Sequence, residues 1–180
     1  MRTNNDSKIL SLYQDGRHQD ALRLLMSSYQ ERLYWHIRRI VLSHDDTDDV
    51  LQNTLVKIWK GLEGFREDSK LYTWMFRIAS NEIFTFIEKN KKHNNHIDIS
   101  DNFDFKDDSH ADDLTGEEIQ EKLELAIATL PEKQRMVFHL KYFEEMKYSE
   151  ISSVLGTSEG ALKANYHLAV KKIEEFLKTN

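Results

Sequence analysis

Aromatic and basic side chains are interleaved between Phe65 and Lys92, a combination that suits single-stranded DNA. Aromatic rings can stack on unpaired bases, while lysine and arginine neutralise the phosphodiester backbone. We expect most of these rings to be core, because Trp74 and Phe86 fall on or near an apolar helical stripe. The exposed candidates are therefore the loop before Leu71 and the polar helix face after it.

A second pattern, from Tyr148 onward, has the form of a helix-turn-helix, whose second helix enters the DNA major groove. Gly156 allows a sharp turn, and Ser158 can cap the next helix. Apolar residues would hold the two helices together: Ile151, Val154, Leu155 and Leu162. The alternative is a helical hairpin in a protein-interaction domain. DNA binding is the favoured interpretation.

Outward positions of that second helix would meet the DNA. Residues near its start would face base edges, and lysines further along would contact phosphates, which position a protein without reading sequence. The candidates are Ser158, Glu159, Gly160, Lys163, Ala164, His167, Lys171 and Lys172.

Enzymatic and metal chemistry find little support in the sequence. The aspartates from Asp45 to Asp49 lack a nucleophile, a glycine-rich phosphate loop or a second acidic cluster in a folded segment. At least two of them are explained by capping at a helix start. His93 and His96 lie in a junction without further ligands, and the later aspartates lack calcium-loop spacing. We therefore expect neither an enzyme nor a metal or cofactor.

The elements that position these residues are predicted to be helices throughout. The 180 residues are 39% hydrophobic and 31% charged, with one proline and six glycines, which favours an all-α protein. Without cysteine or a long apolar run, a cytoplasmic protein with no membrane insertion is expected. Apolar periodicity and turn residues predict helices over about 5–13, 21–41, 44–62, 71–90 and 117–130, from Pro131, and over both arms of the helix-turn-helix.

Charge divides the chain into two domains and a linker. Eleven acidic residues against two lysines give residues 94–124 a net charge of −9, whereas the remainder carries +3. Such runs with few apolar residues usually stay disordered. We expect helical domains over 1–93 and 117–180, joined by a flexible acidic linker over 94–116.

These motifs resemble the sigma factors of bacterial RNA polymerase, in the sigma-70 superfamily. The first signature of conserved region 2 resembles Asp45 to Trp59, and the promoter-melting signature resembles Phe65 with Leu71 to Asn81. Region 4 resembles Leu130 to Arg135 and Tyr148 to Ala161. The short chain, with no room for a region 3 domain, is similar to the extracytoplasmic-function group. Apart from the linker, the resemblance covers nearly the whole chain.

The resemblance implies a transcription initiation factor that contributes no covalent chemistry. The clamp helices of the largest polymerase subunit would bind Asp48, Asp49, Gln52, Lys57 and Trp59. The unpaired −10 strand would be captured by Phe65, Arg66, Ser69, Lys70, Arg77 and Asn81. The helix-turn-helix would read the −35 duplex, the flap region of polymerase would hold its domain, and the linker would follow basic polymerase channels.

The recognition helix departs from the family pattern because it lacks arginine, the strongest donor to guanine and phosphate. From Glu150 onward, four lysines balance four glutamates, so counterion release should contribute little. Two explanations stay open: attachment to polymerase supplies the affinity, or an additional DNA-targeting partner guides promoter choice. An anti-sigma factor is a further candidate partner.

Two other functional classes also stay open. One is a stand-alone helix-turn-helix regulator that binds duplex DNA without polymerase. The other is a protein-interaction module or sigma-like decoy that binds polymerase but does not melt DNA.

Overall fold

The structure, a computed structural model, describes residues 4–93 and 116–179. All the regular secondary structure within these ranges is helical. It forms two compact units, the first containing residues up to Lys89 and the second most of the remaining chain. The predicted all-α fold is confirmed. Within the described ranges, no helix combines the length and the apolar character needed to cross a membrane.

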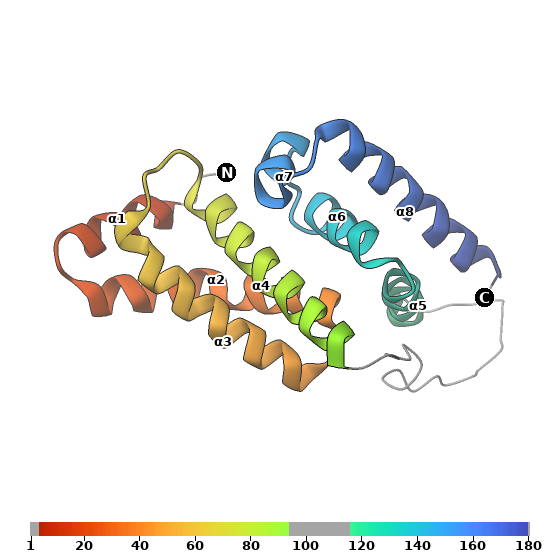
Figure 1. Ribbon diagram of the computed structural model, residues 1–180, viewed down its shortest axis with the longest axis horizontal. Helices are drawn as coiled ribbons and strands as arrows, with labels where there is room; N and C mark the ends of the chain where they lie inside the picture. Colours follow the sequence, from red (N-terminus) through yellow and green to blue (C-terminus); the bar gives the residue numbers. More distant parts are fainter. Residues whose placement is uncertain (1–3, 94–115, 180) are drawn as a thin grey trace. The chain divides into compact units, whose positions relative to one another are not determined.

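Four helices and one short turn build the first unit (Figure 1). Their bounds are α1 Asn4–Gln14, α2 His18–Val41, α3 His44–Gly61, the 3₁₀ turn η1 Leu62–Gly64, and α4 Leu71–His93. Each predicted helix of this region is present. Asp45 and Asp46 lie in the first turn of α3, and Ser43 caps it by accepting a hydrogen bond from the Asp46 amide (3.4 Å). Ser43 therefore supplies the side-chain cap, and the two aspartates lie where their charge offsets the helix dipole.

Apolar stripes of α2, α3 and α4 meet in the core of the first unit. The fully buried side chains include Leu25, Leu33, Ile37, Ile40, Ile58, Met75, Phe76 and Ile83. Burial of each aliphatic side chain contributes roughly 1.5–3 kcal/mol. Together they determine which sides of α3 and α4 remain exposed.

Two buried polar contacts in this core were not anticipated from the sequence. His36 of α2 lies 3.2 Å, Nε2 to Oγ, from Ser80 of α4, and its ring packs against Phe76. Asp6 of α1 is buried and accepts a hydrogen bond from the Tyr29 hydroxyl. The first pair joins α2 to α4 and the second joins α1 to α2, because a buried polar group must find a partner.

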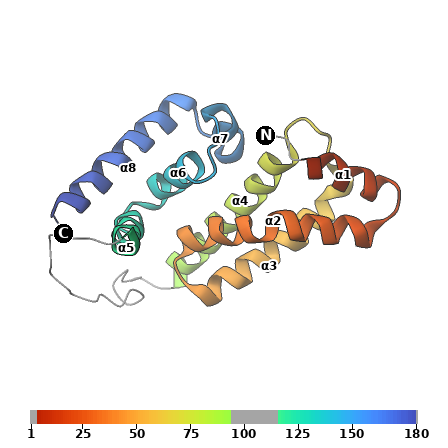
Figure 2. The ribbon, with the colours of Figure 1, turned by 180° about the vertical axis from the view of Figure 1, so that it is seen from behind.

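The second unit contains four helices, also seen from behind in Figure 2. Their bounds are α5 Gly116–Ala128, α6 Glu132–Tyr142, α7 Tyr148–Leu155 and α8 Glu159–Thr179. Because α5 begins at Gly116, the glutamates counted in the acidic segment belong to a helix. The rest of the predicted linker, residues 94–115, lies outside the described residues.

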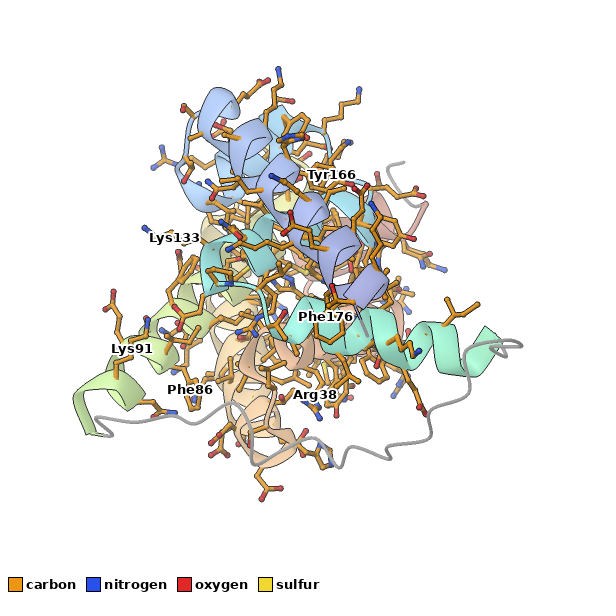
Figure 3. All side chains as sticks on the ribbon, turned by 90° about the vertical axis from the view of Figure 1, so that its right-hand side faces the viewer. Arg38, Phe86, Lys91, Lys133, Tyr166 and Phe176 are labelled. Atoms are coloured by element: carbon orange, nitrogen blue, oxygen red, sulfur yellow. The ribbon has the colours of Figure 1, made fainter. Side chains whose placement is uncertain are left out.

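The core of the second unit joins α5 and α6 to one side of α8. Its buried members are Ala126, Ile127, Leu130, Phe138, Ala169 and Ile173. Tyr166 and Phe176, which project from α8 in Figure 3, are partly buried against this cluster. Tyr166 stacks on Phe138 with ring centres 5.8 Å apart. The inner side of α8 is therefore committed to packing.

Arg135, the one arginine in the sequence after Arg77, is part of this packing. It is only 5% exposed, and its guanidinium donates to the Ala128 carbonyl oxygen at 2.7 Å. Burial lowers the pKa of Arg135, and nearby Glu132 acts in the opposite direction. Its charge ties α6 to the end of α5 and does not face outward.

The turn between α7 and α8 forms as the sequence predicts. Gly156 ends α7 in the left-handed conformation, with φ of 63°, and its amide donates to the Ser152 carbonyl. The Ser158 hydroxyl accepts a hydrogen bond from the Ala161 amide at 3.4 Å, which caps α8. Ile151, Val154 and Leu162 are buried, while Leu155 is half-buried. These helices have the predicted helix-turn-helix arrangement.

Replacing Gly156 by alanine should destabilise the second unit by about 1 kcal/mol, because a Cβ is disfavoured in the left-handed conformation. A Cβ added at Gly156 or at Gly160 would have no other atom within 4 Å, so crowding does not complicate the comparison. Gly160→Ala, inside α8, should instead stabilise the unit by up to about 1 kcal/mol. Amide hydrogen exchange of α7 and α8 in the full chain measures both changes. A destabilisation of equal size at both positions would contradict the turn's dependence on Gly156.

Candidate polymerase and DNA interfaces

The outer face of α3 carries an exposed polar stripe. Asp48, Asp49 and Gln52 are all exposed, as predicted for a docking helix. Val56 lies one turn beyond Gln52 and is 46% exposed, which is unusual for a large apolar side chain. Val56 was not predicted as a surface residue, because a valine in an amphipathic helix is normally assigned to the core. An apolar residue beside acidic and amide groups is typical of a protein-binding surface.

Lys57 and Trp59, predicted as part of the same docking surface, lie on opposite flanks of α3. Lys57 forms an ion pair with Glu82 of α4. Trp59 is half-buried, and its ring packs edge-on against Tyr13, 5.3 Å between ring centres, and near His18. The structure therefore groups Asp48, Asp49 and Gln52 but directs these two side chains to neighbouring helices.

The loop between η1 and α4 is organised around Trp74. Phe65 packs against the Trp74 ring with centres 5.1 Å apart. On its other side, a Cβ at Gly61 would come within 3.0 Å of the Trp74 ring. Glycine at the end of α3 lets the indole approach this closely without displacement, because a Cβ there would push the ring by a few tenths of an ångström. The contact positions the start of the loop relative to the first turns of α4.

A small pocket opens between this loop and α1. Its lining comes from Asp6, Ser7, Leu10, Phe65, Glu67, Ser69 and Leu71. Glu67 has a left-handed backbone, with φ of 59°, which turns the loop sharply at this point. The sequence predicted a role for Phe65 and Ser69 in strand capture, but it did not indicate that residues of α1 line the same pocket.

The exposed side of α4 continues from the loop. Arg77 and Asn81 are one helical turn apart and both exposed, and half-buried Trp74 precedes Arg77 by three residues. In the loop, Arg66 is exposed, whereas Ser69 and Lys70 are half-buried. The predicted strand-binding residues thus lie in the loop and on one side of the helix after it.

Two paired arginine and aromatic side chains on α2 were not predicted. The Arg32 guanidinium lies over the Tyr72 ring of α4, 4.6 Å from its centre, and donates to the Tyr72 hydroxyl at 3.1 Å. Arg39 lies 5.3 Å from the ring centre of Trp35, which is 44% exposed. Cation–π contacts of this kind hold arginine side chains in defined positions.

All the residues predicted to face the −35 duplex are exposed. They are Ser158, Glu159, Gly160, Lys163, His167, Lys171 and Lys172. Lys163 forms an ion pair with Glu159 at 3.9 Å, and Lys171 with Glu175 at 3.8 Å. Each pair lies within α8, so both cations are partly neutralised on the DNA-facing helix.

Tyr148 and Tyr166 anchor the other side of the recognition helix. Lys141 and Lys163 both lie over the Tyr148 ring, at 5.1 and 5.6 Å from its centre. Burial raises the pKa of Tyr166, and the neighbouring phenols of Tyr148 and Tyr142 act in the same direction. Tyr166 is therefore a neutral packing residue at physiological pH.

No group of three or more metal-ligating side chains occurs within residues 4–93 and 116–179. His96 lies outside the described residues, as do the aspartates of the predicted linker.

Two family models match the chain in the order predicted from the motifs. Sigma-70 region 2 matches residues 25–93, which contain most of α2 and all of α3 and α4. Sigma-70, region 4 matches residues 120–173, from α5 into α8. Together the two matches span both exposed interfaces of the first unit and the helix-turn-helix. The chain belongs to the sigma-70 superfamily, in its extracytoplasmic-function group.

Curated relatives of this sigma factor are similar along almost its whole length. An ECF RNA polymerase sigma-E factor of Salmonella typhimurium is 28% identical over 178 residues, covering 94% of this chain and 92% of the relative. The sigma-E factor of Escherichia coli K12 gives the same values. That of Haemophilus influenzae is 26% identical, with 94% and 93% covered.

Two solved structures share the fold. The sigma factor RpoE, in complex with the anti-sigma factor NepR from Bartonella quintana, has a TM-score of 0.69 at 21% identity, covering 88% of this chain and 97% of that one. CnrH, in complex with the cytosolic domain of CnrY, has a TM-score of 0.71 at 20% identity, covering 98% and 99%. Family membership makes this protein a transcription initiation factor and not an enzyme.

Replacing Gly61 by valine should destabilise the first unit by about 1–3 kcal/mol, because the added side chain collides with the Trp74 ring. Gly64→Val is the matched control, since no atom lies within 4 Å of its Cβ position. It should change stability by less than about 0.5 kcal/mol. The three tryptophans, at 35, 59 and 74, all lie in the first unit, so fluorescence-detected urea unfolding reports on it. Equal losses for both variants would show that the Trp74 contact is unimportant.

Proposed function

We propose that this sigma factor binds core RNA polymerase and directs it to promoters by −10 strand capture and −35 duplex recognition. Residues 1–93 would dock on polymerase and melt the −10 element, residues 94–116 would form the acidic linker, and residues 117–180 would read the −35 element. The observation that carries this proposal is the continuity of the Trp74-centred loop with the exposed Arg77 and Asn81 of α4.

Docking on polymerase is proposed for the exposed stripe of α3. Asp48, Asp49 and Gln52 face solvent, so they are accessible to basic and amide groups of the clamp helices. Val56 adds an apolar contact on the same side. Because Lys57 and Trp59 contact α4 and the α1–α2 corner, their part in docking would be to hold α3 in place.

Strand capture is proposed for the loop and the exposed side of α4. An unpaired base would stack beside Phe65, next to the small pocket that α1 and the loop line with hydroxyl and carboxylate groups. Arg66 and Arg77 would neutralise the adjacent phosphates, and Asn81 offers both a donor and an acceptor. Aromatic stacking with backbone neutralisation is the usual chemistry of single-strand binding.

Recognition of the −35 duplex is proposed for α8, with the flap region of polymerase holding the second unit near the DNA. When two DNA-binding units are linked, binding of one raises the local concentration of the other near its DNA site. Neither unit then requires high affinity for DNA alone. An additional DNA-targeting partner is the competing explanation. Footprinting of purified holoenzyme distinguishes them, because sequence-specific −35 protection without another factor removes the need for that partner.

Two solved relatives in fold are complexes, one with the anti-sigma factor NepR and one with the cytosolic domain of CnrY. We extend this to a proposal that the present sigma factor is also held inactive by a protein partner in the cytoplasm. A stand-alone DNA-binding regulator would require neither polymerase nor such a partner. A sigma-like decoy would bind polymerase without supporting runoff transcription.

Replacing Asp49 and Gln52 together by alanine should reduce co-purification with core polymerase by on the order of tenfold, because central interface residues dominate binding. Gln30→Ala with Glu31→Ala is the matched control. It removes the same two kinds of side chain from exposed positions of α2 and should leave binding within about twofold. Circular dichroism verifies the fold of both variants. Unchanged co-purification of the α3 variant would contradict the docking assignment.

Replacing Arg66 and Lys70 together by alanine should impair open-complex formation on the order of tenfold, measured by permanganate reactivity of unpaired thymines. Core polymerase binding should stay within about twofold, because the loop is separate from the α3 stripe. Lys8→Ala with Arg23→Ala removes the same charge from exposed positions of α1 and α2. Equal loss of polymerase binding and melting would contradict the proposed division of roles.

A further inference from the structure

The outward face of α8 has an apolar residue where a DNA reader usually has a polar one. Leu168 is 46% exposed, and it lies one turn beyond Ala164, which is also exposed. The buried residues of the helix, Leu162, Ala169 and Ile173, lie about 100–140° around the helix axis from Leu168, at about 100° per residue. Leu168 therefore lies outside the buried stripe of α8.

Two polar side chains of this helix, Asn165 and Lys163, contact the protein itself. The Asn165 side-chain amide donates to the Ala161 carbonyl oxygen at 2.9 Å. Lys163 is held between Glu159, at 3.9 Å, and the Tyr148 ring. Exposed ion pairs are weak, so lysine can still turn toward a phosphate, but phosphate contacts carry no sequence information.

Arginine cannot supply the missing base contact from this unit. The described second unit contains one arginine, Arg135, which is buried and bonded to the Ala128 carbonyl. The bidentate arginine–guanine pair, the commonest specific major-groove contact, is therefore not available to α8.

The groove feature that an alkyl side chain can read is the C5-methyl group of thymine. We propose that Ala164 and Leu168 read the −35 duplex by packing against thymine methyl groups, so that this element is rich in A·T pairs at the positions they face. The inference rests on the proposed −35 role of α8 and adds the chemistry by which it discriminates.

The spacing of Ala164 and Leu168 along α8 is compatible with the spacing of base pairs in the duplex. Ala164 and Leu168 are separated by about 6 Å along the helix axis, at about 1.5 Å per residue. Successive base pairs are about 3.4 Å apart. The two side chains can therefore reach neighbouring pairs or pairs two steps apart.

The first step of the test identifies the preferred −35 sequence. Holoenzyme assembled from core polymerase and the full chain selects from a promoter library whose −35 box is randomised. Thymines in the selected box are then replaced singly by deoxyuridine, which lacks only the C5-methyl group. Affinity should fall about fourfold at one or two thymines, as expected for the loss of one buried methyl-sized apolar group.

A protein variant assigns the effect to Leu168. Leu168→Ala should weaken promoter binding about tenfold and abolish the sensitivity to deoxyuridine at one thymine, because the contact is removed from the protein side. Leu177→Ala is the control, since Leu177 is 41% exposed on the same helix but nine residues farther along. Its deoxyuridine sensitivity should match that of the unaltered protein.

Three outcomes would overturn the inference. The first is equal affinity for thymine and deoxyuridine throughout the selected box, and the second is selection of guanine at the positions that α8 faces. Either result with a protected −35 box leaves the proposed initiation function intact. The third is absence of any −35 preference in the library, which would also remove the proposed role of α8 in duplex recognition.

Discussion

Burial of one apolar stripe on each helix is the constraint on which the recognition surfaces of both units depend. On α3, burial of Val50, Thr54 and Ile58 leaves Asp49 and Gln52 on the outer side. On α8, burial of Leu162 and Ile173 leaves Ala164 and Leu168 outward. Recognition residues therefore need no separate scaffold. They are the side chains that remain when the hydrophobic effect has oriented each helix.

In the first unit, a contact centred on Trp74 positions the loop that contains the proposed strand-binding residues. The Trp74 ring occupies the space left by the missing Cβ of Gly61, and Phe65 covers it from the loop. The end of α3, the loop and the first turns of α4 thereby meet at one residue. A loop that must receive a flexible nucleotide gains from such an anchor, because less of its conformational entropy is lost on binding.

The sequence was informative wherever a residue's role follows from helix periodicity or turn chemistry. The α7–α8 turn at Gly156, the cap at Ser158 and the exposure of Asp49 and Gln52 were all predictable. Tertiary contacts between helices were not predictable from the sequence. The pairing of Lys57 with Glu82 depends on how α3 lies against α4, and periodicity places a residue on a side without naming its neighbour.

The same limit explains the residues that were missed. Leu168 and Val56 were not identified from the sequence as exposed apolar residues, and His36 was not identified as a core residue. Arg135 is the reverse case. Its type indicates a DNA or polymerase contact, but its position on α6 buries it against Ala128. At these residues, the burial expected from side-chain type differs from the burial expected from the position on the helix. The observed burial follows the position.

The helix α8 carries a net charge of only +1, from four lysines and three glutamates, which separates two contributions to DNA binding: general affinity and base discrimination. A basic helix binds all duplexes more tightly, since counterion release does not depend on base sequence. Apolar contacts with thymine methyl groups add affinity only where thymine is present, so they differ between base pairs. A DNA-binding unit that is linked to a second one does not need strong electrostatic attraction to DNA of any sequence. With alanine and leucine rather than arginine at outward positions, α8 would bind DNA of any sequence less tightly, and the proposed thymine contacts would supply its discrimination between base pairs.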